Sequence, residues 1–180
     1  MTIDIEKKFS HYEKKPTSDS QLVLEDFYER GAWLELVESN YLKEICTPAL
    51  QKAFHLLWVE RGHFIREKMN DDSQLLKLLR LLMPRYEGDG LILYRGENIE
   101  RYRMGRIGFC WTLDERKARQ FASGLNAYKS GGVLLRGWAP AHVILAGVHP
   151  HSQYLGEYEV TIDGSAVEQL EVLATFPVSH

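Results

Sequence analysis

The stretch Leu91-Ile92-Leu93-Tyr94-Arg95-Gly96 marks the point at which the chain changes character. Leu91 to Tyr94 form a short apolar run between glycine signals, which is typical of a buried strand, and Arg95 ends that strand. Three helices are expected before this stretch, and mostly strands after it. The sequence therefore predicts an α+β fold in which the helices are segregated from a sheet.

The segment before this stretch shows apolar residues at helical spacing in three places. A first helical region covers 22–46, with Gly31 as a break, and Pro48 suits the first turn of a second helix. The 71–73 segment supplies N-cap side chains for a third helix that runs to Leu82. The expected apolar stripe of the second helix consists of Leu50, Phe54, Leu57, Trp58 and Ile65.

The segment after Gly96 alternates apolar runs with turn residues. A strand is expected over 107–113, and Asp114 then caps a helix. Further strands are expected over 133–135, 142–148, 157–162 and 172–176. We expect a polar arm over 1–20 and one domain over 21–180, divided into a helical lobe (21–90) and a β-rich lobe (91–180).

The composition excludes several classes of protein. The 180 residues suit one domain, and 44% hydrophobic with 26% charged residues can form a core and a polar surface. The net charge of -3 argues against a general nucleic-acid binder. There is no apolar run of the roughly 20 residues that a membrane helix needs, nor a signal-peptide pattern, so a cytoplasmic location without a membrane partner is expected. Two cysteines, Cys46 and Cys110, are expected to be reduced thiols.

Arg95 is a candidate ligand-binding residue. Its planar fork of donors can bind a phosphate or a ribose edge, and Gly96 allows a ligand or another backbone to approach closely. The alternative is a structural ion pair with Glu97 or Glu100. The local sequence alone favours the ion pair.

The 157–162 segment carries a pair of carboxylates. Period-two alternation would place Glu157, Glu159 and Thr161 on one face, with the two carboxylates roughly 7 Å apart. An ordinary half-exposed strand has the same pattern. The pair indicates function only if its face lines a cleft shared with Arg95.

The Gly108-Phe109-Cys110-Trp111-Thr112-Leu113-Asp114 segment leads into Ala118 and Phe121-Ala122. The simple interpretation is a core strand followed by a capped amphipathic helix, with Thr112 and Asp114 serving only as caps. The order of three segments, Tyr94-Arg95-Gly96, this one, and Glu157-Tyr158-Glu159-Val160, resembles the Arg–Ser–Glu (cholera-toxin-like) class of ADP-ribosyltransferases. It is similar in particular to small bacterial and phage versions.

The resemblance covers about residues 91–162, and it includes 133–137 and 143–146 as the two strands before the final glutamate motif. It implies a split β-sheet core. One position departs from the family pattern, because Cys110 stands where the family usually has serine. The hydrogen bond that holds the catalytic glutamate is then either weakened or moved to Thr112.

The resemblance implies an NAD-dependent mono-ADP-ribosyltransferase that releases nicotinamide and modifies a protein target. Glu159 would bind the ribose 2′-hydroxyl and face the developing oxocarbenium ion, and Arg95 would hold a phosphate or the ribose. Glu157 favours an arginine acceptor. The 147–156 segment takes the place of the family's mobile loop. Its Tyr154 could stack on the ligand, but an exposed loop tyrosine is the simpler interpretation. The NAD-binding residues implied are Arg95, Gly96, Cys110, Trp111, Thr112 and Phe121; the catalytic ones are Glu159, Glu157 and Arg95, with no metal.

Other functions remain open at this point. Cys110 could act as a nucleophile with His142, His149 or His151, although a buried inert thiol is the commoner case. The same histidines lack the spacing of known metal sites. A non-catalytic interaction module on the same fold, an NAD glycohydrolase and a nucleic-acid-modifying enzyme are the further alternatives.

Overall fold

The computed structural model describes residues 18–39, 44 and 46–179. Residues 1–17 of the expected polar arm (1–20), and residues 40–43 and 45 of the expected first helical region (22–46), lie outside the described residues. The helices are α2 (Asp19–Arg30), α3 (Trp33–Glu38), α5 (Pro48–Met69), α6 (Asp72–Leu82), α7 (Ile99–Arg103), α8 (Glu115–Ser123) and α9 (Pro150–Tyr154). The strands are β1 (Leu91–Asn98), β2 (Cys110–Thr112), β3 (Gly132–Ala139), β4 (Ile144–Ala146), β5 (Glu159–Ile162) and β6 (Glu168–Phe176).

The helical part begins and ends at the residues that local chemistry predicts. The Ser18 hydroxyl accepts from Gln21 N in a capping box at the start of α2, and Gly31 ends that helix with a left-handed φ of 62°. Pro48 lies in the first turn of α5. Asp71 caps α6 by accepting from two main-chain N–H groups. The second and third expected helical regions are therefore confirmed, and the first is confirmed as far as Glu38.

The six strands form one antiparallel sheet in the order β4-β5-β2-β1-β3-β6. β1 pairs with β3 along its whole length, from Leu91↔Ala139 to Asn98↔Gly132. By contrast, a single residue pair, Tyr94↔Thr112, joins β1 to β2. The sheet is thus divided into two halves of three strands that meet at one point.

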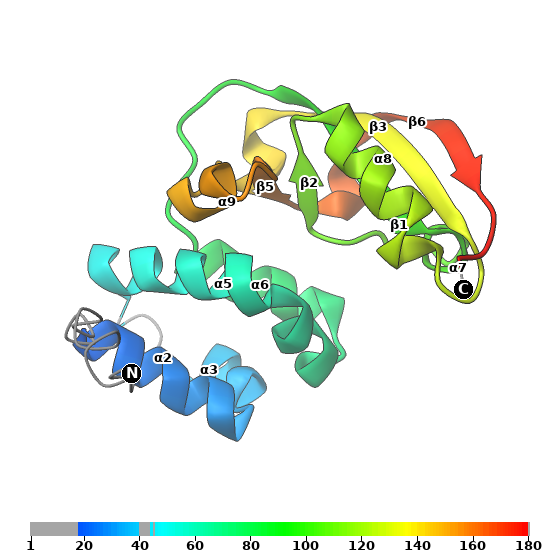
Figure 1. The fold of residues 1–180 in the computed structure, drawn as a ribbon. Helices are drawn as coiled ribbons and strands as arrows, with labels where there is room; N and C mark the ends of the chain where they lie inside the picture. Colours follow the sequence, from blue (N-terminus) through cyan, green and yellow to red (C-terminus); the bar gives the residue numbers. More distant parts are fainter. Residues whose placement is uncertain (1–17, 40–43, 45, 180) are drawn as a thin grey trace, which may run out of the picture.

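The α+β segregation is confirmed, since the described helices before β1 lie to one side of the sheet (Figure 1). Helix α8 covers a face of β1 and β3, where a Cβ on Gly96 would collide with the backbone of α8. The glycine is needed for this close approach of a helix backbone. None of the described helices is both long and apolar enough to cross a membrane.

Hydrophobic residues gather in three clusters. The first joins the helical lobe to the sheet, because it contains Phe109 and Leu145 beside the expected α5 stripe, all of whose members are buried. The second combines residues of both halves of the sheet, including Leu93 and Trp111. The third lies between α8 and the sheet around Leu134. The two lobes therefore share one core at the point where they meet.

The strand boundaries differ from those expected. β1 continues past Arg95 to Asn98, because β3 supplies pairing partners over eight residues. Its apolar run is not uniformly buried, since Ile92 is 44% exposed. β2 and β4 are shorter than expected, because β2 pairs with β5 at three residues and β4 pairs with β5 at only two, and β6 begins earlier, at Glu168. Pairing partners distant in sequence decide these ends.

Candidate functional site

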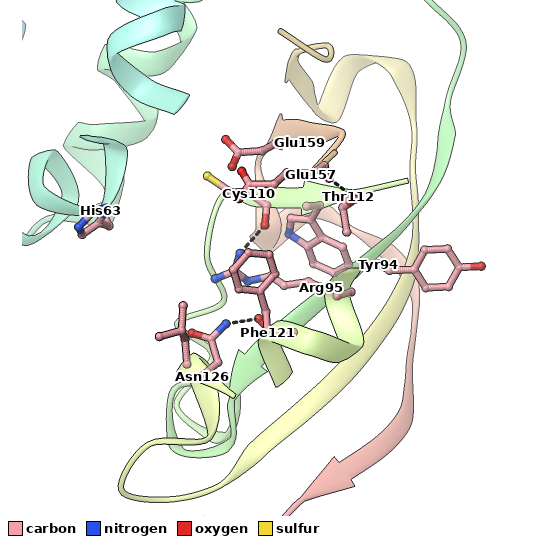
Figure 2. A pocket seen from close by; sticks show the side chains of 13 residues that line it. His63, Tyr94, Arg95, Cys110, Thr112, Phe121, Asn126, Glu157 and Glu159 are labelled. Atoms are coloured by element: carbon pink, nitrogen blue, oxygen red, sulfur yellow. Dashed lines mark hydrogen bonds between the residues drawn. The ribbon is translucent and has the colours of Figure 1, made fainter. Parts of the chain in front are cut away.

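All eight residues expected in the site line one cavity of about 420 Å³ (Figure 2). They come from β1, β2, α8, β5 and the connection just before β5. Five further residues line the cavity, of which only Tyr94 and Ala118 belong to the segments singled out from the sequence: His63, Tyr94, Ala118, Leu125 and Asn126. The structure therefore brings the three sequence segments together around one space. Those eight residues are Arg95, Gly96, Cys110, Trp111, Thr112, Phe121, Glu157 and Glu159.

Arg95 is anchored by the ion pair that the local sequence favoured. Its Nε and Nη2 atoms each lie 2.8 Å from Oε2 of Glu97, whose side chain is fully buried. Its Nη1 donates to the main-chain carbonyl of Cys110. The same Glu97 oxygen accepts from Gly108 N at 2.9 Å. Arg95 thus ties β1 to the segment that leads into β2.

Two glycines allow this arrangement. Gly96 receives the α8 backbone, so the close approach that it allows is that of another backbone, and it also lines the cavity. A Cβ on Gly108 would collide with the Arg95 guanidinium group. Burial of Glu97 raises its pKa, but the Arg95 guanidinium and other partners outweigh burial, so that the pKa lies below its usual value. The Glu97 carboxyl is therefore ionised at neutral pH.

The three residues of β2 have different roles. Trp111 is 1% exposed and its indole N–H donates to Gly108 O at 3.0 Å, so it supports the cavity wall from the core. The Thr112 hydroxyl donates to the Glu157 carbonyl at 2.6 Å and accepts from Asp114 N at 3.0 Å. In the family, the serine at the position of Cys110 holds the catalytic glutamate, and one expectation was that Thr112 takes over this hydrogen bond. Thr112 instead holds the main chain of Glu157.

The prediction that a regular strand places Glu157 and Glu159 on one face is wrong. β5 begins only at Glu159, and Tyr158 has a φ of 48°, in the left-handed region that non-glycine residues rarely adopt. Glu157 therefore lies outside the strand. Both carboxylates still line the same cavity as Arg95, which was the condition for a functional interpretation.

Glu159 has an unusual environment. Its Oε1 atom is shielded from solvent and has no hydrogen-bond partner among the described residues. Burial raises the pKa of this carboxyl to about 7, and the Glu157 carboxylate raises it as well. The contact with the Cys110 thiol, which faces the carboxylate in Figure 2, and the charge of Arg95 oppose this rise. A carboxylate with a pKa near neutrality and a free oxygen is typical of a functional group.

Helix α9 positions the main chain of Glu159. Ser152 is fully buried, and its hydroxyl accepts from Glu159 N at 2.9 Å. His149, the N-cap of α9, lies edge-on to His55 of α5 with ring centroids 4.8 Å apart. The 147–156 segment is therefore no loop over the cavity, since it contains a helix that contacts α5 and lines neither cavity next to Cys110. Tyr154 is 86% exposed, as its simpler interpretation predicted.

Three residues of the cavity carry no sequence signal that points to a site. His63 lies on an exposed face of α5, far along the chain from the sheet segments. Asn126 lies in the short 3-10 helix η1 (Leu125–Ala127), and its amide donates to Gly96 O at 2.7 Å. Leu125, 79% exposed, lies beside it. Single residues such as these can be recognised as parts of a site only from the residues that surround them in the folded structure.

The histidine-based alternatives find no support in the cavities. None of His142, His149 and His151 lines either cavity that Cys110 lines. Burial raises the pKa of the Cys110 thiol well above its usual value, and Glu159 raises it further, so the reactive thiolate is disfavoured. Within the described ranges no group of three histidine, cysteine or carboxylate side chains could hold a metal ion. Cys46 and Cys110 are both free thiols.

Comparison of the chain with models of protein families, with curated proteins and with solved structures found no match.

Proposed function

We propose that this chain is an NAD-dependent mono-ADP-ribosyltransferase that modifies a protein, with an arginine side chain as the acceptor. The observation that carries the proposal is the shielded, unpartnered Oε1 of Glu159 in a cavity shared with Glu157 and Arg95. The resemblance of the three segments to the Arg–Ser–Glu class is a second support. The geometry of the cavity and the sequence resemblance involve the same residues, which follow one another along the chain in the order typical of that class.

Glu159 would act on the substrate at the ribose. As the bond between C1′ and nicotinamide breaks, nicotinamide leaves with the electron pair and positive charge grows on the sugar. A carboxylate close to that charge stabilises the transition state more than the ground state, which is what raises the rate. Oε1 can accept the 2′-hydroxyl hydrogen bond once the side chain turns this shielded atom into the cavity that Glu159 lines. Ionisation of Glu159 is required, so the rate should rise with pH through about 7.

Glu157 would serve the acceptor. It lines the same cavity, and the Thr112 hydroxyl holds its main-chain carbonyl. A carboxylate can bind a guanidinium group through two hydrogen bonds and can take the proton that the attacking nitrogen loses. The new bond joins that nitrogen to C1′. Arg95, held by Glu97, would line the ribose side of the cavity.

The test uses the full chain with NAD labelled in its adenylate part and a cell lysate as the source of acceptors. Glu159→Gln keeps the shape of the side chain but removes its charge, and Glu168→Gln alters an exposed carboxylate on β6 as a matched control. We expect labelled protein with the wild type and the control, and loss by at least 100-fold in Glu159→Gln.

Three results would overturn the proposal in different ways. Released nicotinamide without labelled macromolecules would identify a glycohydrolase. Label confined to nucleic acid would identify a nucleic-acid-modifying enzyme. No turnover by wild-type protein, shown to be folded by its circular dichroism, would favour an interaction module.

A further inference from the structure

A second cavity of about 570 Å³ adjoins the first, and the two share His63, Arg95, Cys110 and Asn126 among their lining residues. It lies where α5 of the helical lobe meets the α7–β2 segment of the sheet lobe. Its size is typical of a small-molecule site. The first cavity carries two carboxylates, whereas this one carries arginines: Arg66, Arg95, Arg101 and Arg106.

Arg95 has little capacity left for an anion, because each of its three nitrogens already contacts a protein oxygen. The other arginines keep free donors. Arg66 is held rigidly, with Nε 2.8 Å and Nη2 2.7 Å from the Asp72 carboxylate, and its Nη1 forms no hydrogen bond with the described residues. Nε of Arg101 lies 3.6 Å from Glu97, a long contact. Arg106 forms no side-chain ion pair within the described residues, which leaves its whole guanidinium group available.

The charges around this cavity do not cancel. Asp72 neutralises Arg66, and Glu97 neutralises Arg95. Arg101 and Arg106 remain, and Glu67, an exposed residue, is the only acidic side chain in the lining. Burial lowers the pKa of Arg101, and the neighbouring arginines lower it further although Glu97 opposes them. Such a group of cations, in a chain of net charge -3, favours an anionic ligand.

Trp58 supplies a second, independent observation. Its indole Nε1 is shielded from solvent and has no hydrogen-bond partner among the described residues, a property shared there only with Glu159 Oε1. Trp58 lines the second cavity, as Glu159 lines the first. A buried donor without an acceptor is costly, and a ligand oxygen in this cavity would satisfy it once the indole turns to expose Nε1. Phe109, whose ring lies edge-on to Trp58 at 6.4 Å, adds an apolar surface.

We propose that the second cavity binds the diphosphate group of a nucleotide through Arg66, Arg101 and Arg106, with Trp58 donating to the same ligand. The inference deepens the proposed function, because a dinucleotide that spans both cavities would place its diphosphate at these arginines rather than at Arg95. It assigns phosphate recognition to residues outside the three sequence segments. It also requires both lobes, since α5 provides Arg66 and the sheet lobe provides Arg101 and Arg106.

The experiment measures binding by isothermal titration calorimetry with the full chain and four probes: ADP, AMP, inorganic pyrophosphate and adenosine. We expect ADP and pyrophosphate to bind, AMP to bind more weakly and adenosine not to bind. Arg101→Ala and Arg106→Ala should each weaken ADP binding about tenfold or more. Arg103→Ala, which changes an exposed arginine of α7 outside the lining, should bind ADP like the wild type. Higher salt should weaken binding.

Two further variants keep the inference separate from catalysis and from folding. Glu159→Gln should retain ADP binding, so a failure of the transferase assay would leave this result intact. Trp58→Phe keeps an aromatic ring but lacks the donor, and circular dichroism monitors its fold; it should bind ADP more weakly. Adenosine binding as tight as ADP binding, equal affinity in the Arg103 and Arg106 variants, or no binding of ADP and pyrophosphate at millimolar concentration would each overturn the proposal.

Discussion

Arg95 and Glu97, two residues apart on β1, form a buried ion pair at 2.8 Å in which the Glu97 side chain has no exposed surface. The pair does more than balance charge. Glu97 also accepts from the main-chain N–H groups of Asn98 and Gly108, while Arg95 reaches the Cys110 carbonyl. The two side chains thereby hold the approach to β2 against β1 at the point where the halves of the sheet meet.

Glu97→Gln should destabilise the protein by about 3–5 kcal/mol, because it leaves the Arg95 charge buried without its partner. Urea unfolding measures the loss. Glu171→Gln is the matched control: it breaks the exposed pair with Arg136, with N–O 3.0 Å apart, and should cost less than about 1 kcal/mol. Equal losses in the two variants would contradict a structural role for the buried pair.

Cys110→Ser should lower the pH at which nicotinamide release reaches half its maximum, and Cys110→Ala should raise it. The contact with the Cys110 side chain lowers the pKa of Glu159, which burial raises to about 7. A hydroxyl donates a stronger hydrogen bond than a thiol, and a methyl group donates none. The pH profile of the rate distinguishes these variants, and shifts in the opposite directions would show that the side chain acts in another way.

Ser152→Ala should reduce kcat while leaving KM for NAD nearly unchanged. The substitution removes the acceptor of the Glu159 main-chain N–H without touching the cavity lining. The loss of a buried hydrogen bond should also cost about 1–3 kcal/mol of stability. Ser123→Ala, which alters an exposed hydroxyl at the end of α8, provides the control. A change in KM alone would argue that α9 does not position Glu159.

Acid should weaken the contact between α5 and α9. Burial and, to a lesser extent, His149 lower the pKa of His55 to about 4. His149, whose pKa is also lowered by burial, faces His151, Glu60 and Lys52 as well. The folded state holds His55 neutral. The contribution of His55 to the stability of the protein is therefore fully present above the ordinary histidine pKa near 6.5, and it is lost as the pH falls toward 4. His55→Phe should flatten this dependence in thermal unfolding from pH 7 to 4, whereas His142→Phe, at an exposed position, should retain it.

The limits of sequence-based prediction can be traced to particular residues. Ser18, Gly31 and Asp71 mark helix ends through contacts with residues two to four positions away, so the helices could be predicted. The end of β1 could not, because Asn98 pairs with Gly132. The positive φ at Tyr158 likewise has no local signal, although it decides how Glu157 and Glu159 are arranged.

The order of elements, the helix caps and the three segments of the candidate site were determined by the sequence alone, because each depends on neighbours within a turn or a strand. The tertiary structure alone decided what those side chains can do. It pairs Arg95 with the buried Glu97 carboxylate. It leaves Glu159 Oε1 and Trp58 Nε1 without hydrogen-bond partners among the described residues, and it brings Arg66 of α5 to the same cavity as Arg101 and Arg106. Burial and charge interactions depend on residues many positions apart along the chain, and only folding brings these together.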